Sequence, residues 1–145
     1  MAQFELTYDY PTTPPPRLFD TLAGIDWIAD VNPLPTRVTH VRDGEGHRYG
    51  VGSLRRIRTG PFPAFEEEIR VFEPPRFIEY EIRAFPFDEH VGSYLVEPAG
   101  AGSRFTFALR LHTPVPLVGE GLAVALQTMS RRGFDELRRR MEGGV

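Results

Sequence analysis

Arg55 and Glu67 are the charged residues best placed to do chemistry, because each lies between apolar or small residues on one face of a predicted strand. The two faces comprise Val51, Ser53, Arg55 and Ile57 in one strand, and Phe65, Glu67, Ile69 and Val71 in the next. Both faces consist of odd-numbered residues, so they coincide in an antiparallel hairpin only when paired residue numbers add to an even total. A three-residue turn at residues 60–62 meets this condition and sets Arg55 opposite Glu67. We expect an inward pair that suits orienting a carbonyl, phenol or carboxylate, unless a slipped register leaves both charges in water.

Three further polar aromatic residues fall on the apolar faces of the following strands. Tyr80 shares its face with two isoleucines, so it is either a core tyrosine or a phenol donor to a ligand. His90 and Tyr94 share one face of the next strand. Histidine is the natural acid–base group near neutral pH, although the acidic residues before His90 also fit a surface position.

Several kinds of chemistry lack the residues that they need. The chain has no cysteine, and all 17 of its basic residues are arginine, so thiolate chemistry and Schiff-base lysines are excluded. Gly50 and Gly52 do not begin a dinucleotide-binding loop, because Arg55 stands where the third glycine belongs. No histidines have metal-ligand spacing, and no G-x-S-x-G motif is present. We therefore expect no metal and no cofactor.

The longest predicted element is an amphipathic helix over residues 116–141. Its apolar residues recur at steps of three and four, as in a helix that covers other elements. They are Val118, Leu122, Leu126, Met129 and Leu137. Gly133 lies on the same face, and there it either makes room for a ligand or for an aromatic side chain, or simply allows close packing. Leu122, Met129 and Gly133 are therefore candidate ligand contacts.

The rest of the chain predicts strands that alternate apolar and polar residues, with two short helices after the first strand. The strands are expected at residues 4–10, 38–43, 49–59, 65–72, 77–84, 89–97 and 104–113, and the short helices at 17–23 and 25–31. Trp27 in the second short helix and Phe107 in the last strand are further candidate contacts. Close spacing of the strands favours an antiparallel sheet of the α+β class, curved around the long helix.

Composition limits the class of protein. The 145 residues favour a single domain spanning 1–145, and a net charge of −3 with interspersed signs argues against nucleic acid. No apolar run approaches the ~20 residues of a membrane span, and the N-terminus does not read as a signal peptide. The sequence therefore predicts a cytoplasmic protein. A homodimer is compatible with it.

Five stretches carry recognisable motifs, at residues 10–19, 27–33, 50–57, 73–80 and 96–98 with 102–105. Together they resemble the START-like (SRPBCC) superfamily, which has the Bet v 1-type helix-grip fold and includes bacterial polyketide cyclase/dehydrase-like proteins. Residues 10–19 resemble its first strand, its proline turn and the start of its "LFDTLA"-type helix, residues 27–33 its second short helix, and residues 50–57 its glycine-led third strand. Residues 73–80 resemble its "P-x-R-hydrophobic-x-Y" strand junction, and residues 96–98 with 102–105 its penultimate hairpin. The resemblance implies a seven-stranded sheet gripping the terminal helix, and between them a cavity for hydrophobic or aromatic, lipid- or polyketide-like ligands.

Three hypotheses for function stay open. The first is a binder of a small hydrophobic molecule. The second is an enzyme of the polyketide cyclase or dehydratase kind, in which Arg55, Glu67, Tyr80 or His90 promotes proton transfer near a carbonyl. The third is a regulatory or chaperone-like module that binds a partner through exposed loop aromatics. The aromatics in question are Phe62, Phe85 and Phe87.

Overall fold

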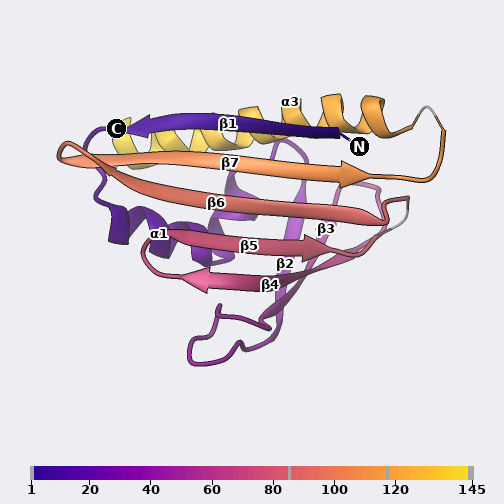
Figure 1. Ribbon diagram of the computed structural model, residues 1–145, viewed down its shortest axis with the longest axis horizontal. Helices are drawn as coiled ribbons and strands as arrows, with labels where there is room; N and C mark the ends of the chain where they lie inside the picture. Colours follow the sequence, from indigo (N-terminus) through magenta and orange to yellow (C-terminus); the bar gives the residue numbers. More distant parts are fainter. Residues whose placement is uncertain (1, 85, 117, 144–145) are drawn as a thin grey trace.

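The computed structural model describes residues 2–84, 86–116 and 118–143, and these form one antiparallel sheet with helices on one face (Figure 1). The strands are β1 (Ala2–Tyr10), β2 (Thr36–Arg42), β3 (Leu54–Thr59), β4 (Phe65–Glu73), β5 (Phe77–Ile82), β6 (Glu89–Ala99) and β7 (Gly102–His112). Their order across the sheet is β1-β7-β6-β5-β4-β3-β2. The helices are α1 (Pro15–Ala23), α2 (Asp26–Val31) and α3 (Gly119–Arg138), and a π-helical turn follows at Arg139–Gly143. The predicted seven-stranded sheet, two short helices and long terminal helix are confirmed.

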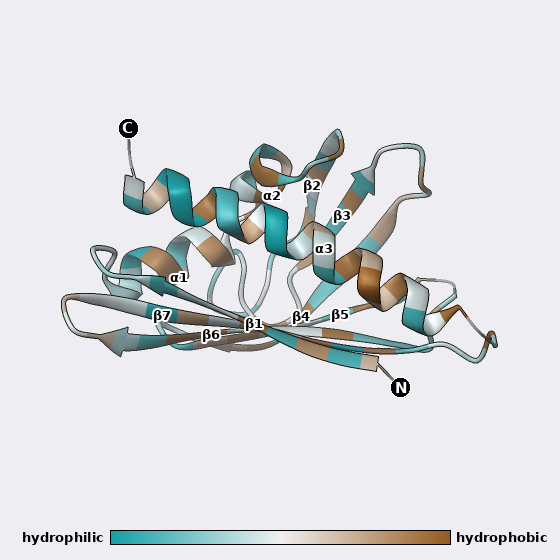
Figure 2. Cartoon of the chain, turned by 90° about the horizontal axis from the view of Figure 1, so that it is seen from above, coloured by the Kyte–Doolittle hydropathy of each residue, from teal (hydrophilic) through white to brown (hydrophobic). Residues whose placement is uncertain are grey.

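The sheet curves toward the helices. Figure 2 shows α2 and α3 on one side of the sheet, with β2 and β3 rising toward that side. Alternation along each strand sends apolar side chains to this concave face, as the sequence predicts. The buried set includes Leu6, Tyr8, Tyr10, Ile69, Ile78, Tyr80, Ile82, Tyr94, Val96, Phe105, Phe107, Leu109 and Leu111. None of the described helices is both long enough and apolar enough to cross a membrane.

Phe134 of α3 holds the long helix against the sheet. Its ring centroid lies 4.8 Å from that of Phe107 and 5.1 Å from that of Phe105. Aromatic pairs in this range of distances add to the free energy of simple burial. The same ring lies 5.6 Å from Trp27 of α2, so one side chain joins the long helix, a short helix and the sheet.

Strand β3 is shorter than the sequence predicts. It begins at Leu54, whereas residues 49–52 form turns and Gly52 has a φ of +88° that favours glycine. A Cβ atom on Gly44 would lie 2.3 Å from the carbonyl oxygen of Gly50, so the chain packs too closely there for a longer side chain. Val51 is consequently 40% exposed and does not share the inward face, contrary to expectation.

A bulge in β4 changes the inward residue near its end. Ile69 pairs with Tyr80, but Val71 pairs with Glu79 and Phe72 with Ile78, so Arg70 is the extra residue. Phe72 therefore packs against the core, with its ring 5.4 Å from that of Phe19, and the prediction that Val71 faces inward is wrong. Period-two alternation cannot reveal such an insertion.

Candidate functional site

A cavity of about 370 Å³ lies between the concave face of the sheet and the helices α2 and α3. This volume falls within the roughly 300–1,000 Å³ of small-molecule sites. Its lining is mostly apolar. Among the residues expected to contact a ligand, the following line it: Trp27, Glu67, Tyr80, His90, Tyr94, Phe107, Leu122, Met129 and Gly133. Their role in binding stays a prediction.

Arg55 and Glu67 are paired as the even-total rule requires, because β3 and β4 set them directly opposite each other. Arg55 Nε lies 3.7 Å from Glu67 Oε1, and the side chains are only 2% and 6% exposed. Glu67 lines the cavity, but Arg55 does not. The expectation that both ions face the cavity is therefore corrected.

The guanidinium of Arg55 turns away from the cavity toward α1 and the loop before β3. Its Nη2 donates to the carbonyl oxygen of Ala23 at 3.5 Å, and its Cζ lies 5.7 Å from the centre of the Tyr49 ring. Its Nε is buried without a hydrogen-bond partner among the described residues. Arg55 thus serves as the counterion of Glu67 without contacting the cavity.

Burial raises the pKa of the Glu67 carboxyl above its usual value, and the nearby Arg55 opposes that rise. The distance of 3.7 Å to Arg55 is longer than a hydrogen bond, so this contact leaves the lone pairs of Glu67 available to a ligand. When it is ionised, the Glu67 carboxylate can accept hydrogen bonds inside the apolar cavity. When it is protonated, it can donate its proton.

Tyr80 and Tyr94 lie beside Glu67, with their ring centroids 5.6 Å apart. Burial raises the pKa of both phenols, so each keeps its proton at neutral pH and can donate it in a hydrogen bond. Gly92 makes this arrangement possible, because a Cβ there would lie 2.2 Å from Tyr80 Cζ. The ring of Tyr80 thus lies across β6 at the only kind of residue that leaves space for it.

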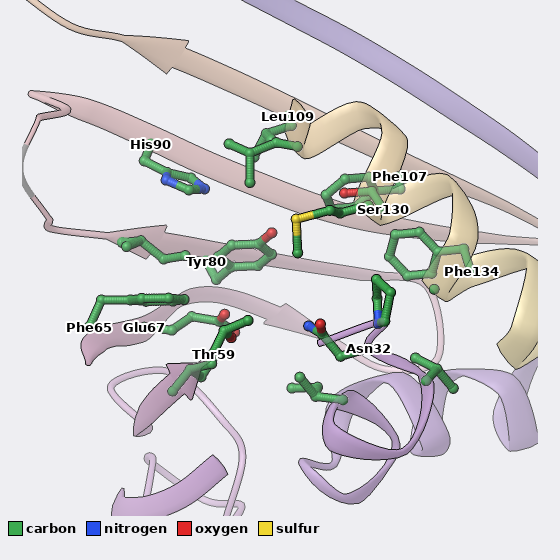
Figure 3. A pocket seen from close by; sticks show the side chains of 18 of the residues that line it. Asn32, Thr59, Phe65, Glu67, Tyr80, His90, Phe107, Leu109, Ser130 and Phe134 are labelled. Carbon is green, nitrogen blue, oxygen red and sulfur yellow. The ribbon is translucent and has the colours of Figure 1, made fainter. Parts of the chain in front are cut away.

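His90 is buried rather than at the surface, with its ring 5.2 Å from that of Phe87. Burial lowers the pKa of His90 to about 4, so its imidazole is neutral at pH 7. Its Nδ1 has no hydrogen-bond partner within the described ranges. Figure 3 shows His90, Tyr80 and Glu67 reaching from neighbouring strands, with Phe134 and Ser130 of α3 across the pocket.

Trp27 and Phe107 supply aromatic wall. The indole Nε1–H of Trp27 donates to the carbonyl oxygens of Leu22 and Gly24, at 3.2 and 3.1 Å. Its one polar atom is therefore satisfied by the backbone, which leaves the ring as a fixed apolar surface.

On the helix side, Leu122 and Met129 line the cavity as expected, whereas Gly133 packs against α2. A Cβ on Gly133 would lie 3.6 Å from Val31 Cγ2 and from the Val31 carbonyl oxygen, which is ordinary contact. The two helices therefore leave room for a methyl group, so close packing does not require glycine at this position, which also borders the cavity.

Gly133→Ala is expected to raise the free energy of unfolding. Glycine inside a helix costs about 1 kcal/mol relative to alanine, and the added methyl group meets no short contact. Thermal and urea unfolding of the two proteins measure the change. A lower midpoint for the variant would contradict the packing described above.

Several lining residues were not singled out from the sequence. Asn32, Thr59 and Ser130 add neutral polar groups, and Phe134 adds the aromatic anchor. The sequence did contain a signal for Ser130 and Phe134, because both follow Leu126 at steps of four and so share its helix face. Asn32 and Thr59 sit at element ends and carry no such signal. Among the described residues, no three His, Cys, Asp or Glu side chains gather closely enough to hold a metal ion.

The loop aromatics proposed to bind a partner differ in their exposure to solvent. Phe62 is 57% exposed and borders the cavity, whereas Phe87 is half-buried and packs against the core. Phe85 lies outside the described residues. The described loop aromatics therefore do not form one exposed patch.

The family model for polyketide cyclase/dehydrase and lipid transport matches residues 1–142 of the chain. Similar solved structures include a START superfamily protein from Mycobacterium smegmatis, at TM-score 0.80 and 11% identity over 99% of each chain. XoxI from Bacillus cereus has TM-score 0.74 and 19% identity over 97% of this chain and 96% of that one. Ara h 8.0201 has TM-score 0.73 and 17% identity over 97% of each chain. At these identities the likeness establishes the fold alone. No curated protein sequence matches.

Proposed function

Because the chain belongs to the polyketide cyclase/dehydrase and lipid transport family, we propose that it binds a small hydrophobic molecule, aromatic or lipid-like, in the cavity between the sheet and α3. Members of this family generally bind hydrophobic ligands. The identity of the ligand is not specified by family membership.

The cavity itself is the observation that carries the proposal. Its wall combines aromatic and aliphatic side chains with a few convergent polar groups, which is the usual composition of a ligand site. A fully packed interior would have favoured the partner-binding alternative. The open volume favours a ligand instead.

The direct experiment is native mass spectrometry of protein purified from its own organism, which identifies any molecule that travels with it. Trp27 gives a second measurement, because it is the only tryptophan and it lines the cavity. Titration with candidate ligands is expected to change its emission. A ligand that binds without altering Trp27 fluorescence would lie elsewhere and would contradict the proposal.

Filling the cavity is expected to abolish most ligand binding. Met129→Trp places a larger side chain at the lining, where it takes up space that a ligand needs, and we expect affinity to fall about tenfold or more, which corresponds to about 1.4 kcal/mol or more. Val124→Trp on the same helix is the matched control, because Val124 is 65% exposed. Calorimetry measures both variants with the ligand found by mass spectrometry. Equal affinities would place the ligand outside this cavity.

Catalysis is a second candidate function, favoured by the groups at one end of the cavity. Burial raises the pKa of Glu67 and lowers the pKa of His90, so Glu67 is the candidate proton donor and the neutral His90 the candidate proton acceptor. Such groups could assist proton transfer next to a carbonyl of a bound poly-β-ketone. Turnover of such substrates tests this candidate, with Tyr80→Phe and His90→Gln as variants. Unchanged rates in both would remove these side chains from any catalytic role.

A further inference from the structure

None of the ionisable groups on the described cavity wall carries a positive charge. Among the described residues that line it, they are Glu67, His90, Tyr80 and Tyr94, and no arginine is included. His90 is neutral because burial lowers its pKa to about 4, and both phenols keep their protons. No positive charge therefore faces a bound molecule from this wall.

Among the described residues, the cation beside Glu67 is Arg55, and it cannot be reached from the cavity. Arg55 is 2% exposed and its guanidinium contacts Glu67, the Ala23 carbonyl and the Tyr49 ring. A buried arginine stays charged and needs a counterion, because an uncompensated buried charge is strongly destabilising. Glu67 is the only carboxylate within ion-pair distance of it among the described residues. This keeps Glu67 engaged as the anion of the pair.

A ligand carboxylate would meet unfavourable electrostatics at this end. It would leave water for an apolar cavity without a cation to pair with, and it would approach Glu67, which carries the same charge when it is ionised as the partner of Arg55. A hydroxyl or phenol would instead donate to the free lone pairs of Glu67 and could accept from the tyrosines.

We propose that the cavity selects neutral ligands whose polar end donates a hydrogen bond to Glu67, such as an alcohol or phenol, and rejects carboxylates such as fatty-acid anions. The inference rests on the proposed function and names the chemical class that this site takes.

Two matched pairs of probes test it: anthracenemethanol with anthracenecarboxylate, and dodecanol with dodecanoate, below the critical micelle concentration. Calorimetry at pH 7 is expected to show the alcohol binding about tenfold or more tightly than the acid in each pair that binds, because the ligand carboxylate and the Glu67 carboxylate repel each other. Equal or tighter binding of the carboxylate would overturn the inference and leave the proposed function standing. Binding of none of the four probes would overturn both.

Glu67→Gln tests whether Glu67 is the group that makes the cavity prefer alcohols to carboxylates. Its amide offers a donor to an anion and removes the repulsion, so the alcohol-to-carboxylate affinity ratio is expected to fall about tenfold or more. Glu66→Gln on the outward face of β4 is the matched control and is expected to leave the ratio unchanged. An unchanged ratio in Glu67→Gln would overturn the inference.

The double variant Arg55→Met/Glu67→Leu covers the case in which Glu67→Gln fails to fold, because it removes both buried ions together. Loss of a hydrogen bond to a charged group is expected to weaken alcohol binding about tenfold. Full retention of alcohol affinity would show that Glu67 accepts no bond from the ligand.

Discussion

Arg55→Met is expected to lower the free energy of unfolding by about 3–5 kcal/mol at neutral pH, because it leaves Glu67 buried without its counterion. The double variant Arg55→Met/Glu67→Leu is expected to be near neutral or stabilising, since two apolar side chains can replace a buried ion pair. Chemical denaturation measures both. A double variant no more stable than the single one would show that packing, rather than charge, makes Arg55 necessary.

The loss in Arg55→Met is also expected to depend on pH. Without Arg55, burial acts unopposed to raise the pKa of Glu67 in the folded state. An acid with a raised folded-state pKa binds its proton more tightly when folded, so stability is kept at low pH and lost as pH rises through that pKa. The stability difference from wild type should therefore be smaller at pH 5 than at pH 8. Arg56→Met is the control, because Arg56 lies on the outward face of β3 and is exposed.

Alternation along the strands predicts much of the site. Ile78, Tyr80 and Ile82 face inward as the sequence indicates, and the opposition of Arg55 and Glu67 follows from the numbering of a short hairpin. The first feature depends on the backbone period alone, and the second also depends on the register that the turn sets. The period also places His90 and Tyr94 on the same face, where both are buried.

The direction of a long side chain does not follow from that period. Arg55 points inward from its strand, but its guanidinium reaches the carbonyl of Ala23, which is distant in the sequence. Gly92 was not singled out, although the Tyr80 ring lies where its Cβ would be. Tertiary neighbours decide both features, and no local pattern contains them.

Irregularities of the backbone explain the remaining differences between the predicted and the observed inward-facing residues. The turns before Leu54 and the bulge at Arg70 each shift which residues face inward. Both irregularities lie at the same end of the β3–β4 pairing, beyond the Leu54–Glu68 pair, so the opposition of Arg55 and Glu67 is unaffected. Neither Val51 nor Val71 lines the cavity, and the cavity wall itself is therefore predicted well.

Phe134→Ala is expected to destabilise the protein by about 3–5 kcal/mol, because it removes a buried ring that contacts both the sheet and α2. The sheet must still hold α3 through Leu137 and the half-buried Leu126, so the fold is expected to survive. Thermal and urea unfolding measure the loss. Val124→Ala, on the exposed side of the same helix, is the control and is expected to change stability by less than about 0.5 kcal/mol.

Phe134→Ala also tests whether the cavity depends on the Phe134 ring. Phe134 lines the cavity, so its removal enlarges the space where the proposed ligand binds. A ligand that fits the enlarged cavity is expected to restore part of the lost stability, because binding to the folded state alone raises the free energy of unfolding by mass action. If Phe134→Ala is no less stable than Val124→Ala, then α3 is held to the sheet by other contacts, and the cavity does not depend on this ring.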